Sequence, residues 1–66
     1  MLEITLNGDP AKTTAETLEQ LIVELGLSDQ RVATAINDEF VAATKRAEQR
    51  LSQGDKIEIV SARQGG

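Results

Sequence analysis

Apolar and polar residues alternate over residues 2–6, at the start of the chain. This is the period of a strand with one buried face. Asn7 and Gly8 follow directly, and an Asn-Gly pair supplies the positive φ angles of a two-residue type I′ hairpin turn. A second strand over 9–13 is therefore expected beside the first. It should lie at an edge of the sheet, because Pro10 cannot donate a ladder hydrogen bond.

The apolar residues next adopt the period of a helix. Four of them share one helical face over about 18–25, at the spacing i, i+3, i+4 and i+7: Leu18, Leu21, Ile22 and Leu25. Thr17, with Gln20 three residues later, fits a capping box at the start of this helix, while Thr13 and Glu16 form a competing one. Gly26 stands where a left-handed residue would end the helix. This helix is expected to be the main cover of the sheet.

The second half of the chain predicts three more strands, at 32–36, 39–41 and 56–60. The segment 42–51 is expected to be irregular or a short helix. The first and last strands can pair in parallel only through a crossover, which the helix provides in the usual right-handed sense. We therefore expect an α+β fold, a mixed sheet of about five strands packed on one main helix.

Composition restricts the possible functions. The 66 residues make one domain that is too thin to enclose a deep substrate cavity. A net charge of −4 disfavours nucleic acid as a partner. The chain has no cysteine and no histidine, so transition-metal sites and Cys- or His-based nucleophiles lack their usual residues. The lack of cysteine and of a long apolar run leads us to expect a cytoplasmic protein that does not bind membranes.

The C-terminus is then the part of the chain best suited to covalent chemistry. We expect a folded domain over 1–61 and a flexible tail over 62–66. Gly65 lacks a Cβ and Gly66 carries the terminal carboxylate on an unhindered carbon, so the tail could enter a narrow channel of a partner enzyme. ATP can make such a carboxylate reactive by converting it into an acyl-adenylate. From the two glycines alone, a functionless flexible end remains an alternative.

Four stretches of the sequence carry a family resemblance. They lie in order along nearly the whole chain: ITLNG at 4–8, AINDEFV at 35–41, GDKIEIV at 54–60 and QGG at 64–66. In these stretches and in length the chain resembles the thiamine-biosynthesis sulfur carriers, the ThiS family, which implies the ubiquitin-like β-grasp fold. Members commonly have a Pro-Arg pair after the fourth strand and then an aromatic residue. Here Ala42 and Ala43 occupy those positions, which puts in doubt any partner contact made by that loop.

The resemblance also implies how the C-terminus would work. A ubiquitin-activating-like adenylyltransferase would adenylate the Gly66 carboxylate with ATP and magnesium. Sulfur from a cysteine desulfurase persulfide would convert it into a thiocarboxylate, and thiazole synthase would use that sulfur to build the thiazole ring of thiamine. The chain itself would be no enzyme and would bind no cofactor or metal. Gly65, Gln64 and Arg63 would be needed for the tail to enter its partners.

Two surfaces are candidate partner contacts. Phe40, Val41 and Val60 are predicted to form an exposed apolar patch on the sheet face away from the helix. The alternative is that Phe40 closes one end of the thin core. A second set of residues, basic and close in sequence, could dock an acidic partner, although a solvated face is the default: Lys45, Arg46 and Arg50.

Other functions are compatible with such a chain. The small subunit of molybdopterin synthase shares the fold and the Gly-Gly end, although it is usually longer. Another ubiquitin-like sulfur carrier, or a protein modifier joined through Gly66 to lysines, would use the same tail. A β-grasp binding module whose glycines do nothing is the alternative from a different class.

Overall fold

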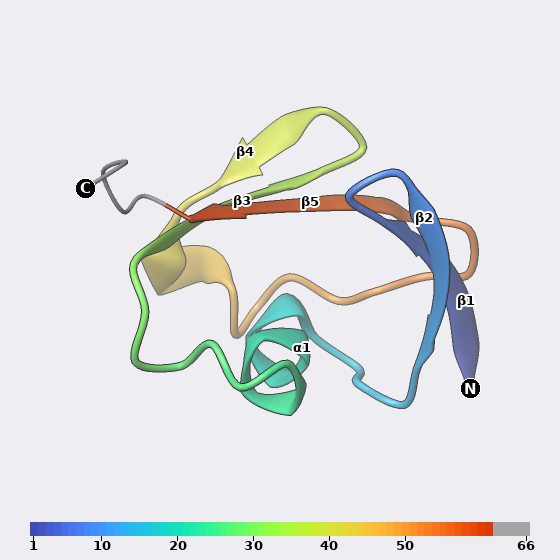
Figure 1. The fold of residues 1–66 in the computed structure, drawn as a ribbon, viewed down its shortest axis with the longest axis horizontal. Coiled ribbons are helices and arrows are strands. Elements are labelled where there is room, and N and C mark those ends of the chain that lie inside the picture. The colour runs from blue at the N-terminus through green and yellow to red at the C-terminus, as the bar shows by residue number, and fades with distance from the viewer. Residues whose placement is uncertain (62–66) are drawn as a thin grey trace.

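The computed structural model describes residues 1–61, so the predicted tail over 62–66 lies outside the described residues. The elements follow in the expected order: β1 (Leu2–Leu6), β2 (Asp9–Thr13), α1 (Leu18–Glu24), β3 (Val32–Ile36), β4 (Glu39–Val41), the 3₁₀ turn η1 (Ala43–Lys45) and β5 (Lys56–Ser61). The five strands form one sheet in the order β2-β1-β5-β3-β4 (Figure 1). Strands β1 and β5 are parallel and the other pairs are antiparallel. The predicted mixed sheet is confirmed.

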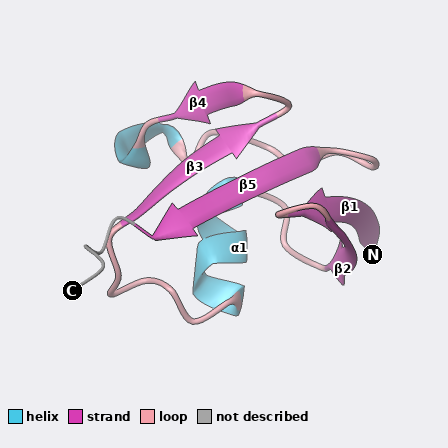
Figure 2. Cartoon of the chain, turned by 45° about the horizontal axis from the view of Figure 1, so that its top comes forward, coloured by secondary structure: helices cyan, strands magenta, loops and turns pink. Residues whose placement is uncertain are grey.

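The helix α1 and the turn η1 lie on the same side of the sheet, as Figure 2 shows, with β5 in the middle of the strands. The core fills the space between α1 and the sheet, where Leu18 and Ile57 are completely buried. We call the opposite side of the sheet the open face. In the part of the chain that the structure describes, no helix is long and apolar enough to cross a membrane.

The N-terminus of α1 is capped as the sequence predicts. The Gln20 amide donates to the Thr17 hydroxyl at 3.2 Å, and the Gln20 side chain accepts from the Glu16 amide at 2.7 Å. Thr13 makes no such cap, because its hydroxyl accepts from the Ala15 amide and donates to the carboxylate at the far end of the helix. The helix therefore begins after Thr17, and the competing start is wrong.

The C-terminus of α1 is a Schellman motif built on Gly26. Its φ of 74° is left-handed, as expected for a residue that ends a helix. The Leu27 amide donates to the Ile22 carbonyl at 3.0 Å and the Gly26 amide donates to the Val23 carbonyl at 3.0 Å. These two bonds satisfy carbonyls that the helix leaves unpaired and turn the chain back toward β3.

Candidate functional site

The strand β5 is the base from which the C-terminal residues continue. It lies between β1 and β3 and ends at Ser61. The residues predicted to carry the chemistry and to enter the partners, Gly66, Gly65, Gln64 and Arg63, lie outside the described residues. The structure therefore describes the end of β5, from which these residues continue, and the contacts that hold it.

One edge of β5 pairs with β3 over five positions, from Ile36↔Ile57 to Val32↔Ser61. The other edge pairs with β1 over only two positions. Asn7 extends this shorter pairing. Its backbone amide donates to the Ile57 carbonyl at 2.9 Å, its side-chain Nδ2 donates to the Ile59 carbonyl at 3.1 Å, and its Oδ1 accepts from the Ile59 amide at 2.8 Å. The side-chain amide thus replaces a strand backbone and holds β5 closer to its C-terminal end.

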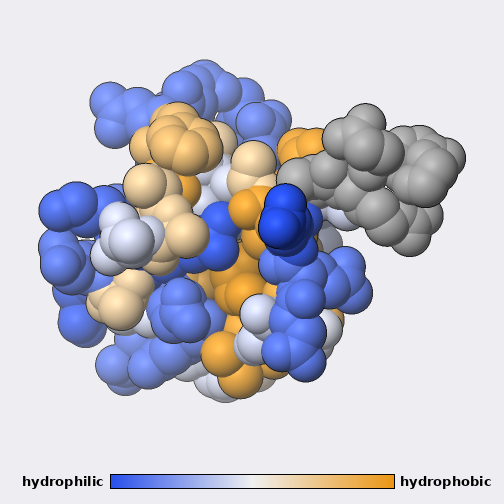
Figure 3. Space-filling model, turned by 90° about the vertical axis from the view of Figure 1, so that its left-hand side faces the viewer, coloured by the Kyte–Doolittle hydropathy of each residue, from blue (hydrophilic) through white to orange (hydrophobic). Residues whose placement is uncertain are grey.

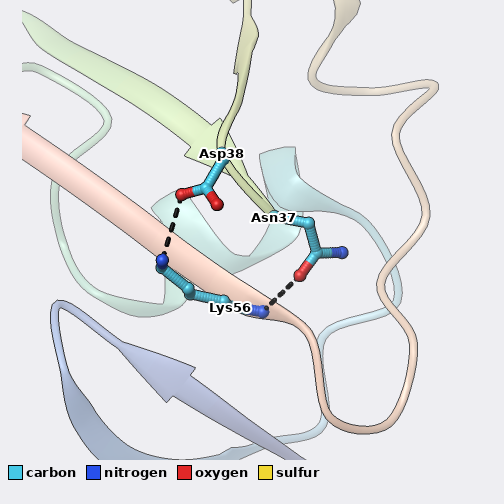
Figure 4. A network of polar contacts seen from close by, with 3 residues as sticks. All are labelled: Asn37, Asp38 and Lys56. Carbon is cyan, nitrogen blue, oxygen red and sulfur yellow. Dashed lines mark hydrogen bonds and ion pairs between the residues drawn. The ribbon is translucent and has the colours of Figure 1, made fainter.

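A second asparagine fixes the beginning of β5, as Figure 4 shows. The Asn37 Oδ1 accepts from the Lys56 amide at 3.0 Å, and the Asn37 amide donates to the Lys56 carbonyl at 2.7 Å. The Lys56 ammonium lies 3.0 Å from the Asp38 carboxylate. The hydrogen bond to Asp38, then the negative charges of Asp38 and Glu58, raise the pKa of Lys56 above its ordinary value. The same exposed turn thus contacts both the backbone and the side chain of β5.

Both asparagines occupy left-handed backbone positions in hairpin turns. The φ angles are 51° at Asn7 and 88° at Gly8, and 52° at Asn37 and 72° at Asp38. Positive φ at both central residues is the geometry of a type I′ turn, which confirms the turn expected at Asn7. Each asparagine thus has two roles: its backbone forms the turn, and its side chain bonds to β5.

The predicted apolar patch is confirmed at two positions and wrong at one. Phe40 is 73% exposed and Val60 is 61% exposed, so Phe40 does not close an end of the core. Val41 is only 7% exposed and belongs to the core. Successive residues of a strand point to opposite faces, so Phe40 and Val41 of β4 cannot share one face. The strand predicted at 39–41 already implies that these two neighbouring residues point to opposite faces.

Two alanines complete the exposed apolar surface. The strand registers pair Phe40 with Ala35 and Val60 with Ala33, which places all four residues on the open face. The alternation of β3 is weak because alanine is compatible with either face, so the sequence alone left these two unassigned. We call Phe40, Ala35, Ala33 and Val60 the open-face patch. It crosses three strands and ends one residue before Ser61.

Figure 3 looks at the end of the molecule where β5 finishes. Apolar surface gathers there between hydrophilic rims. On the open face, polar and charged residues lie toward β1, β2 and the start of β5: Glu3 is opposite Lys12, and Lys56 is opposite the uncharged Thr5. The exposed apolar residues of the open face therefore lie beside the end of β5, and Glu58, opposite Ala35, marks their border on that strand.

The structure does not bring the three predicted basic residues together as one solvated surface. Lys45 and Arg50 are exposed, but Arg46 is half-buried. Its Nη2 donates to the Val32 carbonyl at 2.7 Å and its Nε donates to the Thr34 hydroxyl at 3.0 Å. Neither the solvated face expected by default nor a docking patch made by all three fits Arg46, because its guanidinium is already bonded to β3.

Comparison with known proteins agrees with the motifs in the sequence. The family model described as the ThiS family matches residues 4–66. The sulfur carrier protein ThiS of Thermus thermophilus is 32% identical over 63 residues, which cover 96% of this chain and 98% of that protein. A thiazole synthase of Paramagnetospirillum magneticum is 35% identical over 66 residues, which cover 98% of this chain and 20% of the synthase. The chain thus spans about a fifth of the length of that enzyme.

A solved structure has the same fold. The crystal structure of the thiamine biosynthesis protein ThiS from Geobacter metallireducens superposes with a TM-score of 0.81 at 23% identity, covering 98% of this chain and all of that one. The ubiquitin-like β-grasp fold is therefore confirmed. Since the family model covers nearly every residue and the Thermus carrier matches from end to end, this chain belongs to the ThiS family.

Proposed function

We propose that this chain carries sulfur for the thiazole ring of thiamine, bound to the carboxyl group of Gly66. The observation that supports this most is the family match over residues 4–66, which runs through Gly65 and Gly66 themselves. The carrier from Thermus thermophilus supports the role of sulfur carrier. The absence of cysteine and histidine in the chain is compatible with a cargo held on the C-terminus and not on a side chain.

The proposed chemistry takes place in partner enzymes. A ubiquitin-activating-like adenylyltransferase binds ATP and magnesium, and the Gly66 carboxylate attacks the α-phosphate, releasing pyrophosphate. The terminal sulfur of a persulfide, formed from cysteine by a desulfurase, then bonds to the carbonyl carbon as AMP leaves. A second thiol cleaves the sulfur–sulfur bond, which forms a disulfide and frees the thiocarboxylate. In this scheme the chain is a substrate and supplies no catalytic group.

The thiazole synthase of Paramagnetospirillum magneticum supports the choice of acceptor. A fifth of that polypeptide resembles the whole of this chain. A carrier-like segment and a thiazole synthase therefore occur in one polypeptide in that organism. We propose that this chain delivers its sulfur to a thiazole synthase, and that it meets both partners in the cytoplasm.

We further propose that the open-face patch is where the activating partner docks. Exposed apolar residues that gather on one face often mark interaction sites. Phe40 is the largest of them, and aromatic residues are frequent among the side chains that contribute most to binding. Val60 lies two residues before Ala62, so a partner docked here is close to the start of the predicted tail. Arg63, Gln64 and Gly65 would then lead Gly66 into the adenylation site.

Intact mass spectrometry tests the proposed function. The chain is incubated with the activating partner, ATP, magnesium, cysteine and the desulfurase, and we expect a mass gain of one oxygen-to-sulfur exchange at Gly66. Deletion of Gly66 is the matched control and should show no gain. If the full chain shows none with a partner that thiolates another ThiS-family carrier, the proposal is refuted.

Two further results separate the remaining alternatives. Loss of the gene should create a need for thiamine or its thiazole, whereas a defect in molybdenum enzymes would point to molybdopterin synthase. A protein modifier would instead appear in cells as larger species linked through lysine. A binding module would keep its activity after Gly65 and Gly66 are removed.

A further inference from the structure

Arg46 joins the turn after β4 to both strands of the β3–β4 hairpin. Its guanidinium donates to the Val32 carbonyl and to the Thr34 hydroxyl, at 2.7 Å and 3.0 Å. The same hydroxyl donates to the Val41 carbonyl at 2.8 Å, and Thr34 is only 1% exposed. The guanidinium, the hydroxyl and the two carbonyls thus form one continuous set of three hydrogen bonds. The arginine guanidinium is planar and carries several N–H donors, so it can bond to two acceptors at once.

The backbone of Arg46 is also held. Its carbonyl accepts from the Glu19 amide at 3.1 Å, in the first turn of α1. The preceding amide, that of Leu18 at the first position of α1, donates to the Gln49 carbonyl at 2.8 Å. The segment that carries Arg46 is therefore packed against the N-terminus of α1, while its side chain reaches β3. Arg46 links the helix to the sheet.

The place where it reaches β3 is next to the end of β5. Pairing of β3 with β4 ends at Thr34↔Val41, whereas pairing of β3 with β5 continues to Val32↔Ser61. The first two residues of β3, Val32 and Ala33, thus extend beyond the end of β4. Arg46 donates to the Val32 carbonyl in this stretch, where a longer β4 would have paired. The guanidinium takes the place of the missing strand.

We propose that Arg46 is a positioning residue for the C-terminus. By holding Val32 it fixes the stretch of β3 against which β5 ends, and so fixes the point from which residues 62–66 continue toward the activating partner. The effect on sulfur loading rests on the proposed function, but the effect on β5 is measurable in the chain alone. Lysine at this position keeps the positive charge, but its single ammonium group cannot reproduce the two-pronged geometry of the guanidinium donors.

Three variants test this: Arg46→Ala, Arg46→Lys and, as the matched control, Arg50→Ala. Arg50 is exposed, lies four residues further along the same segment, and its replacement changes the net charge by the same amount. Amide hydrogen exchange by NMR compares Val60, near the end of β5, with Ile57 near its start. We expect Arg46→Ala to accelerate exchange at Val60 relative to Ile57 by about tenfold, the effect of one charge-assisted hydrogen bond. Arg46→Lys should lie between Arg46→Ala and the parent chain, and Arg50→Ala should match the parent.

A kinetic measurement separates positioning from stability. Adenylation by the activating partner is measured through the pyrophosphate that it releases. In this assay a partly unfolded variant behaves as a lower concentration of the parent chain, so its apparent KM rises and its kcat is unchanged. Poor positioning instead lowers kcat, because docked chains deliver Gly66 less often. We expect Arg46→Ala to lower kcat several-fold, with partial rescue by Arg46→Lys. Both assays use the full chain.

The outcomes are distinct. Equal exchange at Val60 in Arg46→Ala and Arg50→Ala overturns the proposal, and so does a change in KM alone. If Arg46→Ala accelerates exchange at Val60 but the parent chain is not adenylated, the positioning of β5 by Arg46 is supported and the proposed function fails.

Discussion

Replacing Asn7 by aspartate tests how much the side-chain amide contributes to holding β5. The two side chains have nearly the same shape, both tolerate left-handed backbone, and Asp-Gly also forms type I′ turns. Asn7→Asp therefore preserves the turn and the acceptor for the Ile59 amide. It removes the donor to the Ile59 carbonyl and places a carboxylate oxygen 3.1 Å from it. The substitution thus removes one of the hydrogen bonds between Asn7 and β5 and keeps the others.

The expected cost follows from that geometry. Loss of one intramolecular hydrogen bond costs about 0.5–1.5 kcal/mol, and facing two acceptors toward each other in a half-buried place adds to it. We expect about 1–2 kcal/mol of destabilisation at neutral pH. A chain of this length has a total free energy of unfolding of roughly 3–10 kcal/mol, so the loss is a substantial share. For so small a domain it corresponds to a decrease in Tm of about 4–15 °C.

The cost should depend on pH in a defined direction. A protonated carboxyl group has an O–H that can donate to the Ile59 carbonyl, so it restores the lost bond. The folded state then favours the protonated form, which raises the pKa of the introduced group above the ordinary value of about 3.9. The difference in stability between parent and variant should be full at neutral pH and should shrink as the pH falls through that raised pKa.

Urea unfolding of parent and variant at several pH values measures this difference. Gln30→Glu is the control, because Gln30 is exposed and its replacement adds the same charge. Hydrogen exchange at the Ile59 amide reports local opening of β5 and should accelerate in Asn7→Asp, because this part of the strand loses one of its two bonds to the side chain at position 7. A variant as stable as the parent at neutral pH, within about 0.3 kcal/mol, would refute the reasoning, as would a cost equal to that of Gln30→Glu.

Three further predictions concern the rest of the domain. Thr17→Ala removes the helix cap seen at the Gln20 amide and should cost about 1 kcal/mol in urea unfolding. Ile57→Val removes one methylene from a completely buried side chain and should cost about 0.5–1.5 kcal/mol by the same assay. Asp38→Asn should lower the pKa of Lys56 toward its ordinary value of 10.5 in an NMR titration. Because the folded pKa is raised, the pair stabilises the fold while Lys56 is protonated, and that contribution is lost as the pH rises through it.

The local pattern of the sequence predicts most of the fold because each element is determined by near neighbours. Alternating apolar residues define β1 and β5, and the Asn-Gly turn at 7–8 defines the first hairpin. Thr17 and Gly26 mark the two ends of α1 through bonds that span only a few residues. Val41 shows the limit of a residue-by-residue interpretation. Its apolar character suggested the same patch as Phe40, but the pleat of a three-residue strand sends the two to opposite faces.

The contacts that surround the end of β5 were not predictable in the same way, because they join residues far apart in the chain. The Asn7 side chain meets Ile59, 52 residues later, and nothing near Asn7 distinguishes that role from a simple turn. Arg46 appeared in the sequence as one of three close basic residues, for which solvent is the default partner. Its bonds to β3 depend on β4 stopping at Val41 while β3 and β5 continue. In a domain this thin, a side chain completes the ladder where a strand ends early. The residues that hold β5 in place therefore emerge only once the register of the whole sheet is known.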